Sequence, residues 1–385
     1  MQRTKVSSQT YPFIGMLFCF TSYCIIQIIN QEVSANLVVW MIGCIVHLGF
    51  IPLIFIHSSV FISKKTVLNF IDQIHYVSLP ICILGIIQYF SPPSSLVNKY
   101  VSDDMFIALV GDHVRITGVF SYISGHAIYL GFVLPFMLIQ VFNTTRINLK
   151  SIVYTCIFLL GIVNLLMTGS RGAVGMFAIN AVVIFMALSV SMPPKKVLIY
   201  AINFIVIGLL GYAVLLNTET GNEAFTSFAG RIEGNSDVGG RVTDSFTPFK
   251  FLDTSGLIGF GIGTTYAANE PLLSNRYLMP AYWEEESERL VLELGLLGFV
   301  VIIILRATIF VFAIKTFKSL SDPVLKQIAL VIMVLQIPGV LAFNTITFNW
   351  LENVFYWTGV GLLVALNQVE YYEKQKASGI GLTFG

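Results

Sequence analysis

The sequence has little charge for its length. Only 11% of its 385 residues are Asp, Glu, Lys or Arg, whereas soluble domains carry about 25%. Its hydrophobic share is 56% and its mean hydropathy is +0.80. These values exclude an ordinary soluble domain and indicate a protein whose solvent is the membrane. The formal net charge of +1 gives no reason to expect a nucleic-acid partner.

Cysteine motifs, internal repeats and low-complexity tracts are also absent. All five cysteines lie inside apolar runs, and none belongs to a C-x-x-C pair. We therefore interpret them as small hydrophobic residues rather than as disulfide partners or metal ligands.

Long apolar runs dominate what is present. A transmembrane helix needs about twenty mostly apolar residues, and ten segments satisfy this rule. We predict an all-α polytopic membrane protein with about ten spans. The segments lie near 11–29, 37–57, 67–90, 121–141, 151–167, 172–191, 197–216, 289–314, 327–343 and 351–368.

Lysine and arginine between the spans predict the orientation of the protein. With a cytoplasmic N-terminus, every inside segment carries at least two basic residues, and the short outer loops carry none. An even number of spans returns the C-terminus to the cytoplasm. Three polar segments then lie on the outer face, where we expect function: 91–120, 168–172 and 217–288.

The longest polar segment, 217–288, far exceeds the length of a loop that only connects spans. We interpret it as the working part, between a seven-span region at 1–216 and a three-span region with a cytoplasmic tail at 289–385. Hydrophobic residues at helical spacing predict short amphipathic helices within it.

Arg171 stands where one apolar span ends and the next begins. Position alone fits an anchor that reaches lipid phosphates. However, the sequence TGSRG at 168–172 also supplies two glycines, two hydroxyls and exposed amides at the expected start of a helix, which is an anion-binding arrangement. Together these features favour phosphate binding by Ser170 and Arg171.

Three further arginines belong to the predicted outer face. Arg115 precedes the fourth span, where it fits an interfacial anchor, and Arg231 and Arg241 lie in the long loop, where solvated arginines are common. Arginines that converge on a lipid-linked diphosphate would each form charge-assisted hydrogen bonds worth roughly 1.5–3 kcal/mol. We take Arg115 and Arg231 as candidate binding residues, and Arg241 with Arg171 as candidate catalytic residues.

Aromatic and acidic side chains precede the eighth predicted span. A charged helix start would explain the carboxylates, because they favour the N-terminus of a helix. In the alternative, Glu286 or Glu288 is a general base that removes a proton from an attacking sugar hydroxyl. Tyr282 and Trp283 would then stack on the sugar.

Other signals are weaker. His126, at the outer end of the fourth span, is a candidate substrate-binding residue. No outer cluster has His, Cys and Asp at metal-ligand spacing, so we expect no metal and no other cofactor. The glycine-rich run at 259–263 lacks a preceding strand and a complete G-x-G-x-x-G, so it is no nucleotide loop. It predicts a tight turn or a close approach of two backbones.

Three segments together resemble the O-antigen ligase and Wzy-type polymerase superfamily. They are RITGVF at 115–120, MTGSRGA at 167–173, and ELGLLG at 293–298 after a long outer loop. The resemblance covers about residues 115–300, and residues 241–263 are similar to the family's central loop.

This resemblance implies a metal-independent glycosyltransferase with a GT-C-like helical fold. Such enzymes move glycan from an undecaprenyl diphosphate carrier to an acceptor sugar at the outer face of the bacterial cytoplasmic membrane. By that analogy Arg115, Arg171 and Arg241 bind the diphosphate and neutralise charge on the leaving group. Expected partners are the lipid-linked oligosaccharide and membrane lipids, with a chain-length regulator and a flippase as further ones.

Two alternatives stay open. The ligase branch is expected to carry a histidine in the long loop, and residues 217–288 contain none. This absence favours a polymerase over transfer to a lipid or protein acceptor. A flippase for the same lipid-linked sugar should carry charges inside its spans, where this sequence has few. We therefore predict a polymerase of lipid-linked oligosaccharide repeat units.

Overall fold

The computed structural model divides the chain into two compact units. The first unit comprises Met1–Lys64 with Asp237–Gly385, and the second comprises Lys65–Ser236. These units are groups of residues that contact one another. The division expected at 217 and 289 instead separates apolar from polar segments of the sequence, so the two divisions describe different properties. The described residues are 11–30, 36–99, 107–110, 113–143, 148–191, 195, 197–199, 201–202, 205, 209, 251–273, 286–340 and 346–377.

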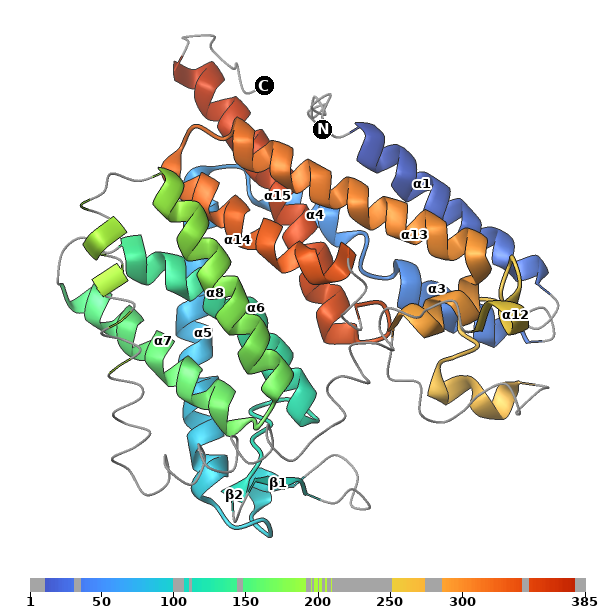
Figure 1. The fold of residues 1–385 in the computed structure, drawn as a ribbon, viewed down its shortest axis with the longest axis horizontal. Coiled ribbons are helices and arrows are strands. Elements are labelled where there is room, and N and C mark those ends of the chain that lie inside the picture. The colour runs from blue at the N-terminus through green and yellow to red at the C-terminus, as the bar shows by residue number, and fades with distance from the viewer. Residues whose placement is uncertain are drawn as a thin grey trace. The chain divides into compact units, whose positions relative to one another are not determined.

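The second unit is built around one central helix, α6 (Ile123–Asn143), which packs against α7 (Leu149–Met167) and α8 (Arg171–Ser191) (Figure 1). Most of α6 is buried because apolar side chains cover its whole circumference. The helix α7 begins with a capping box in which Asn148 and Ser151 bond each other's backbone amides.

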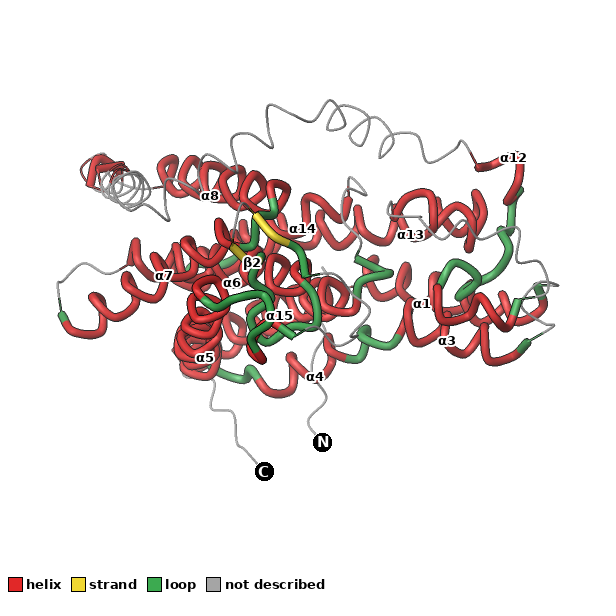
Figure 2. The backbone as a smooth tube through the Cα atoms, turned by 90° about the horizontal axis from the view of Figure 1, so that it is seen from below, coloured by secondary structure: helices red, strands yellow, loops and turns green. Residues whose placement is uncertain are grey.

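The unit also holds α5 (Lys64–Phe90), whose first residue belongs to the first unit, and short elements between α5 and α6. These are the 3-10 helix η3 (Leu96–Asn98) and two antiparallel two-residue strands, β1 (Leu109–Val110) and β2 (His113–Val114). Figure 2 shows this pair in yellow beside helices in red.

The first unit is a helical bundle in which α13 packs against α1 and α14, and α15 packs against α4. Apolar side chains of α1, α3 and α13 form its core, among them Phe13, Phe20, Val46 and Ile309. Its elements are α1 (Tyr11–Ile26), η2 (Gln27–Ile29), α3 (Leu37–Leu48), α4 (Leu53–Val60), α12 (Leu252–Ser255), η5 (Ala267–Leu272), α13 (Glu286–Ser319), α14 (Pro323–Val340) and α15 (Trp350–Ala377).

The helix α13 is broken at Gly295. This residue has φ 64° and ψ −172°, which are not helical values. The predicted span at 289–314 falls within this element, which is long and apolar enough to cross a membrane. It is not one continuous helix, since a short arm at 286–294 and a long arm at 296–319 meet at this glycine. The break brings Glu286 to Arg306, twenty residues further along the same element.

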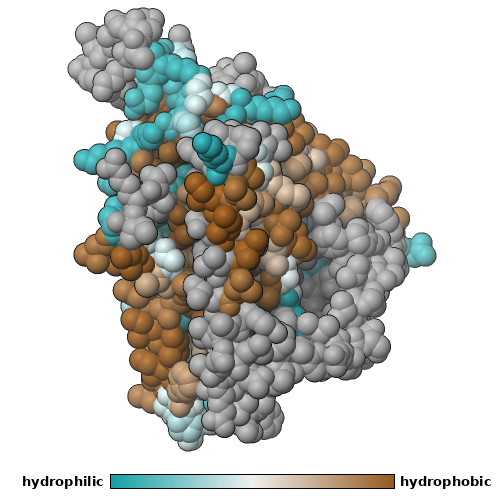
Figure 3. Space-filling view, turned by 60° about the vertical axis from the view of Figure 1, so that its left-hand side comes forward, coloured by the Kyte–Doolittle hydropathy of each residue, from teal (hydrophilic) through white to brown (hydrophobic). Residues whose placement is uncertain are grey.

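The expectation of a helical membrane protein is confirmed in its coarse form. Among the described residues, seven helices are long and apolar enough to cross a membrane. Large apolar side chains also remain exposed on helix faces, such as Val77 and Ile87 on α5 and Val182 and Met186 on α8. Figure 3 shows hydrophobic residues, in brown, gathered over much of the visible surface.

Individual predicted spans fit less closely. The expected span at 37–57 coincides with the candidate span Leu37–Val60, which two helices, α3 and α4, make up. Pro52, at their junction, has no amide hydrogen for a helical bond. The first span corresponds to a shorter apolar helix, Phe13–Ile29, and 351–368 falls within α15. Most of the predicted span at 197–216 lies outside the described residues.

Candidate functional site

The structure places Arg115 against the turn that contains Ser170 and Arg171. Arg115 Nε donates a hydrogen bond of 2.8 Å to the carbonyl of Thr168, and the amide of Ile116 lies 3.5 Å from the carbonyl of Met167. The chain after β2 therefore runs along the end of α7, next to the first residue of α8. The Arg115 side chain is thus held by backbone close to Arg171.

The turn itself is fixed by short-range hydrogen bonds. Thr168 Oγ1 donates to the carbonyl of Leu165 at 2.6 Å and accepts from the amide of Ser170 at 3.2 Å. Gly169 has φ 63°, a backbone conformation that glycine adopts without steric cost. Thr168 is fully buried, while Ser170 and Arg171 are half-buried.

The start of α8 is suited to an anion. Its first-turn amides lack partners within the helix, and the helix dipole adds partial positive charge there. No acidic side chain occupies the first turn of α8. Two basic residues are near this helix start: Arg171 is its first residue, and Arg115 bonds to Thr168 in the preceding turn.

Gln88, which sequence reasoning missed, holds the segment after Arg115 in place. The side-chain oxygen of Gln88 accepts from the amides of Thr117 and Gly118 at 3.1 and 2.8 Å. Its amide nitrogen donates to Thr117 Oγ1, Gly118 O and Val97 O at 3.2, 3.0 and 2.9 Å. The sequence could have pointed to Gln88, because a glutamine in an apolar helix needs hydrogen-bond partners once it is buried.

His126 lies behind this segment. The ring is fully buried, and its Nε2 is 3.3 Å from Asn164 Oδ1. Gly118, with φ 58°, packs so closely on the ring that a Cβ atom there would lie 2.5 Å from Nδ1. His126 therefore supports the backbone of Gly118, and the structure gives it no surface for the substrate contact expected from the sequence.

Glu286 belongs to the first unit, where it is buried in an ion pair with Arg306. Its other oxygen accepts from the amide of Thr347 at 3.0 Å, and Thr347 Oγ1 donates to the carboxylate at 3.1 Å. A general base must reach the proton it removes. These contacts fit a structural carboxylate instead. Glu288 is also buried, with 5% of its surface exposed.

Glu293 is a fully buried carboxylate with several hydrogen-bond donors around it. It accepts from the amides of Gly263 and Thr265 at 3.0 and 2.9 Å and from Thr265 Oγ1 at 2.6 Å, and it lies 2.8 Å from His47 Nε2. Arg289 completes the cluster by donating to Thr265 O at 2.9 Å.

The glycine-rich run at 259–263 makes the close backbone approach that the sequence predicted. Gly259, Gly261 and Gly263 all have positive φ. The amides of Phe260 and Gly261 donate to the carbonyls of Leu292 and Glu293 at 2.8 and 2.9 Å. The run therefore packs against the short arm of α13, directly beside the break.

Buried ionisable side chains gather in the first unit, where residues distant in sequence meet beside the break in α13. His47, Glu286, Glu288, Glu293 and Arg306 each have 5% or less of their surface exposed.

The remaining predicted site residues, Arg231, Arg241, Tyr282 and Trp283, lie outside the described residues. Within the parts of the chain that the structure describes, no group of three or more His, Cys, Asp or Glu side chains has the arrangement of a metal site.

Searched against models of known protein families, the chain has no match, and it has none among curated proteins either. Function is therefore inferred from the geometry of the site and from the motifs in the sequence.

Proposed function

We propose that the chain is a glycosyltransferase that polymerises lipid-linked oligosaccharide repeat units. Arg115 and the turn at 168–172 would bind the diphosphate of an undecaprenyl diphosphate carrier. The observation that carries this proposal is the hydrogen bond from Arg115 Nε to the carbonyl of Thr168, because it fixes one guanidinium beside the helix that begins with Arg171.

The chemistry of the reaction requires positive charge at this place. An acceptor hydroxyl attacks the anomeric carbon, the bond from that carbon to the phosphate oxygen breaks, and the diphosphate leaves with the electron pair. The hydroxyl proton passes to a base. Negative charge grows on the departing oxygen, so guanidinium groups and helix amides that are already in position stabilise the transition state more than the ground state.

The proposed location is the bacterial cytoplasmic membrane, with the site facing the periplasm or the exterior. Contacts in the first unit support the assignment of three segments to one common side of the membrane. Lys64 lies 2.5 Å from Asp322, and the amide of Ser321 donates to Glu370 at 2.9 Å. These residues come from three segments that the distribution of basic residues assigns to the cytoplasm.

A flippase for the same lipid-linked sugar is the second candidate, and the buried ionic cluster of the first unit favours it. Ionisable groups within membrane helices commonly line the pathways of transported substrates and protons. The contacts of Glu286 and Glu293 with Arg306 and His47 meet this description.

The cellular glycan profile tests the proposal. Cells that carry Arg171→Ala should lose the ladder of long polysaccharide chains while the protein remains inserted, whereas Lys99→Ala, at an exposed basic residue of the same unit, should keep the ladder. Undiminished chain length in the Arg171→Ala strain would contradict the proposal. Ladders that persist without their anchor would indicate a ligase.

A further inference from the structure

The turn at 256–259, which follows α12 in the first unit, exposes two adjacent apolar side chains. Leu257 and Ile258 have 61% and 55% of their surface exposed. They belong to the segment that the sequence predicts to be a polar outer loop. Single exposed apolar residues are common on proteins, so the backbone and the surroundings of this pair decide what it contacts.

All four carbonyls of the turn accept hydrogen bonds from protein groups. The amides of Leu296 and Leu297, at the start of the long arm of α13, donate to the first two at 3.2 and 3.1 Å. The side-chain amides of Gln27 and Asn30, both buried, donate to the last two at 2.9 and 2.8 Å. A turn in water needs no such partners, because water bonds its carbonyls. Backbone next to hydrocarbon must instead find its partners within the protein.

The long arm of α13 places this turn at an edge of the membrane. At about 1.5 Å per residue, the arm at 296–319 is roughly 36 Å long. It is therefore long enough to cross about 30 Å of hydrocarbon by itself. Leu296 and Leu297, at its end, then lie near one boundary of the hydrocarbon layer. The turn that bonds to their amides lies at the same depth.

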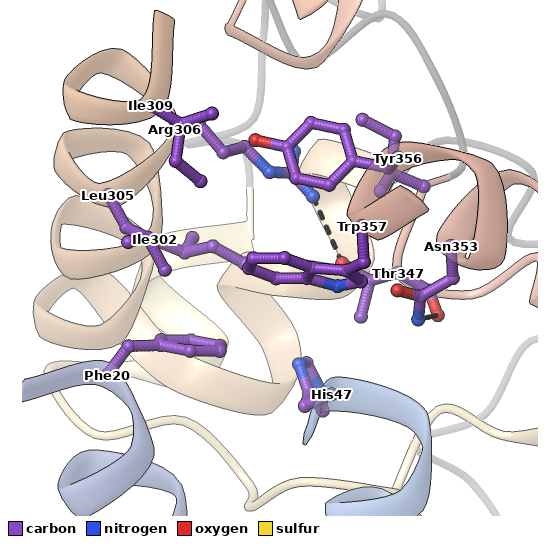
Figure 4. A pocket seen from close by; sticks show the side chains of 11 residues that line it. Phe20, His47, Ile302, Leu305, Arg306, Ile309, Thr347, Asn353, Tyr356 and Trp357 are labelled. Carbon is purple, nitrogen blue, oxygen red and sulfur yellow. Dashed lines mark hydrogen bonds between the residues drawn. The ribbon is translucent and has the colours of Figure 1, made fainter. Parts of the chain in front are cut away.

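The outward side of α13 leads directly to the turn. Exposed apolar side chains recur at helical spacing and form one stripe along the long arm: Leu297, Val300, Ile304 and Val311. The opposite side of the arm faces the interior of the bundle, where it lines a small pocket (Figure 4) with Ile302, Leu305, Arg306 and Ile309. The stripe therefore faces away from the bundle, and its first residue bonds to the carbonyl of Leu257.

We propose that the turn at 256–259 sits in the lipid bilayer, with Leu257 and Ile258 among the acyl chains just beneath the headgroups. Apolar side chains at this depth gain hydrophobic free energy without crossing the membrane. The bonded carbonyls and the continuous apolar stripe of α13 both match this surrounding. Part of the predicted polar loop thus contacts lipid. This inference does not depend on the proposed function.

Site-specific photo-crosslinking of the full-length protein tests the proposal in liposomes of phosphatidylethanolamine and phosphatidylglycerol. The photoreactive amino acid p-benzoylphenylalanine replaces Leu257 in one variant. It replaces Val300, on the exposed stripe of α13, in a second variant and Ser94, an exposed polar residue, in a third. Phospholipid adducts should form at position 257 in a yield similar to that at position 300 and well above that at position 94.

Two results of this experiment would overturn the proposal. One is a lipid yield at position 257 no higher than that at position 94 while position 300 is labelled. The other is a crosslink from position 257 to a second copy of the chain in place of lipid, which would assign the turn to a protein interface.

A depth measurement with Leu257→Trp decides the question if the photoreactive side chain disturbs the turn. The difference in fluorescence from wild type isolates the added indole from the four native ones. Lipids brominated near the headgroup end of the acyl chains should quench this added emission more than lipids brominated near the methyl end. Quenching by aqueous iodide and by neither brominated lipid would show that the turn lies in water.

Discussion

At the scale of single residues, buried polar side chains fix the geometry of the candidate site. Gln88 satisfies the backbone of Thr117 and Gly118, and that backbone continues directly from Arg115. The position of Arg115, which we propose binds phosphate, thus depends on Gln88, a neutral side chain that would not contact the phosphate. Sequence reasoning concentrates on charged residues and misses such a support.

Replacing Gln88 with leucine should destabilise the protein by about 2–5 kcal/mol, because two buried amides lose their acceptor. Thermal unfolding of the purified protein in detergent measures this effect. The control is Gln73→Leu, at an exposed position of the same helix, which should change the unfolding temperature little. Equal effects of the two substitutions would show that the hydrogen bonds of Gln88 contribute nothing.

The buried pair of Arg306 and Glu286 gives a second prediction at this scale. Arg306→Met leaves a buried carboxylate without its counter-charge and should cost about 3–5 kcal/mol of stability. The double variant Arg306→Met, Glu286→Leu removes both charges and should recover part of this loss. Denaturant unfolding compares the two proteins. A double variant less stable than the single one would contradict the view that Arg306 neutralises the buried charge of Glu286.

At the scale of elements, the break in α13 organises the first unit. Gly295 and Gly259 approach so closely that a Cβ atom on Gly295 would lie 2.4 Å from the backbone nitrogen of Gly259 and 2.5 Å from the carbonyl of Leu257. The amides of Leu296 and Leu297 donate to the carbonyls of Gly256 and Leu257 at 3.2 and 3.1 Å. The segment 256–261 therefore hydrogen-bonds to both arms of α13, on either side of the break.

Gly295→Ala should destabilise the protein by roughly 1–3 kcal/mol, because the new Cβ meets backbone and φ lies in the left-handed region. Gly175→Ala in α8 is the control, since nothing lies within 4 Å of the added atom and alanine favours a helix. Thermal unfolding should separate the two variants clearly. A Gly295→Ala protein as stable as wild type would mean that the break tolerates a side chain.

At the scale of the whole molecule, the sequence predicted the helical membrane class and the position of most helices. Apolar runs are local signals, so hydropathy finds them. The pairing of His47 with Glu293 is different, because 246 positions separate the two residues. The contact of Glu286 with Arg306 depends on a break that a continuous apolar run conceals. The residues next to each of these side chains in the sequence do not indicate which distant side chain it will contact.

Acid sensitivity is predicted for the turn between α13 and α14. Partial burial alone would raise the pKa of Asp322, but the hydrogen bond and charge of Lys64, with the amides of Val324 and Leu325, hold this pKa below its ordinary value. A carboxyl whose pKa is lower in the folded protein stabilises it above the unfolded value of about 3.9, and this contribution disappears as pH falls through the folded value.

Asp322→Asn should therefore lower the unfolding temperature near neutral pH, and the difference from wild type should shrink as pH falls below about 4. Asp253→Asn, at an exposed position on α12, provides the comparison. Unfolding scans across this pH range measure both variants. A difference that stays constant with pH would exclude the ion pair with Lys64 as its cause.

The central claim is that Arg115 and the turn before α8 bind the diphosphate of a lipid-linked sugar. The most direct measurement is chain extension by purified protein in liposomes that contain undecaprenyl diphosphate-linked oligosaccharide. Wild type should lengthen the glycan, and Arg115→Ala and Arg171→Ala should each be roughly 10- to 150-fold slower, which corresponds to the loss of about 1.5–3 kcal/mol. Extension by Arg171→Ala at the wild-type rate, or translocation by wild type without lengthening, would contradict the account.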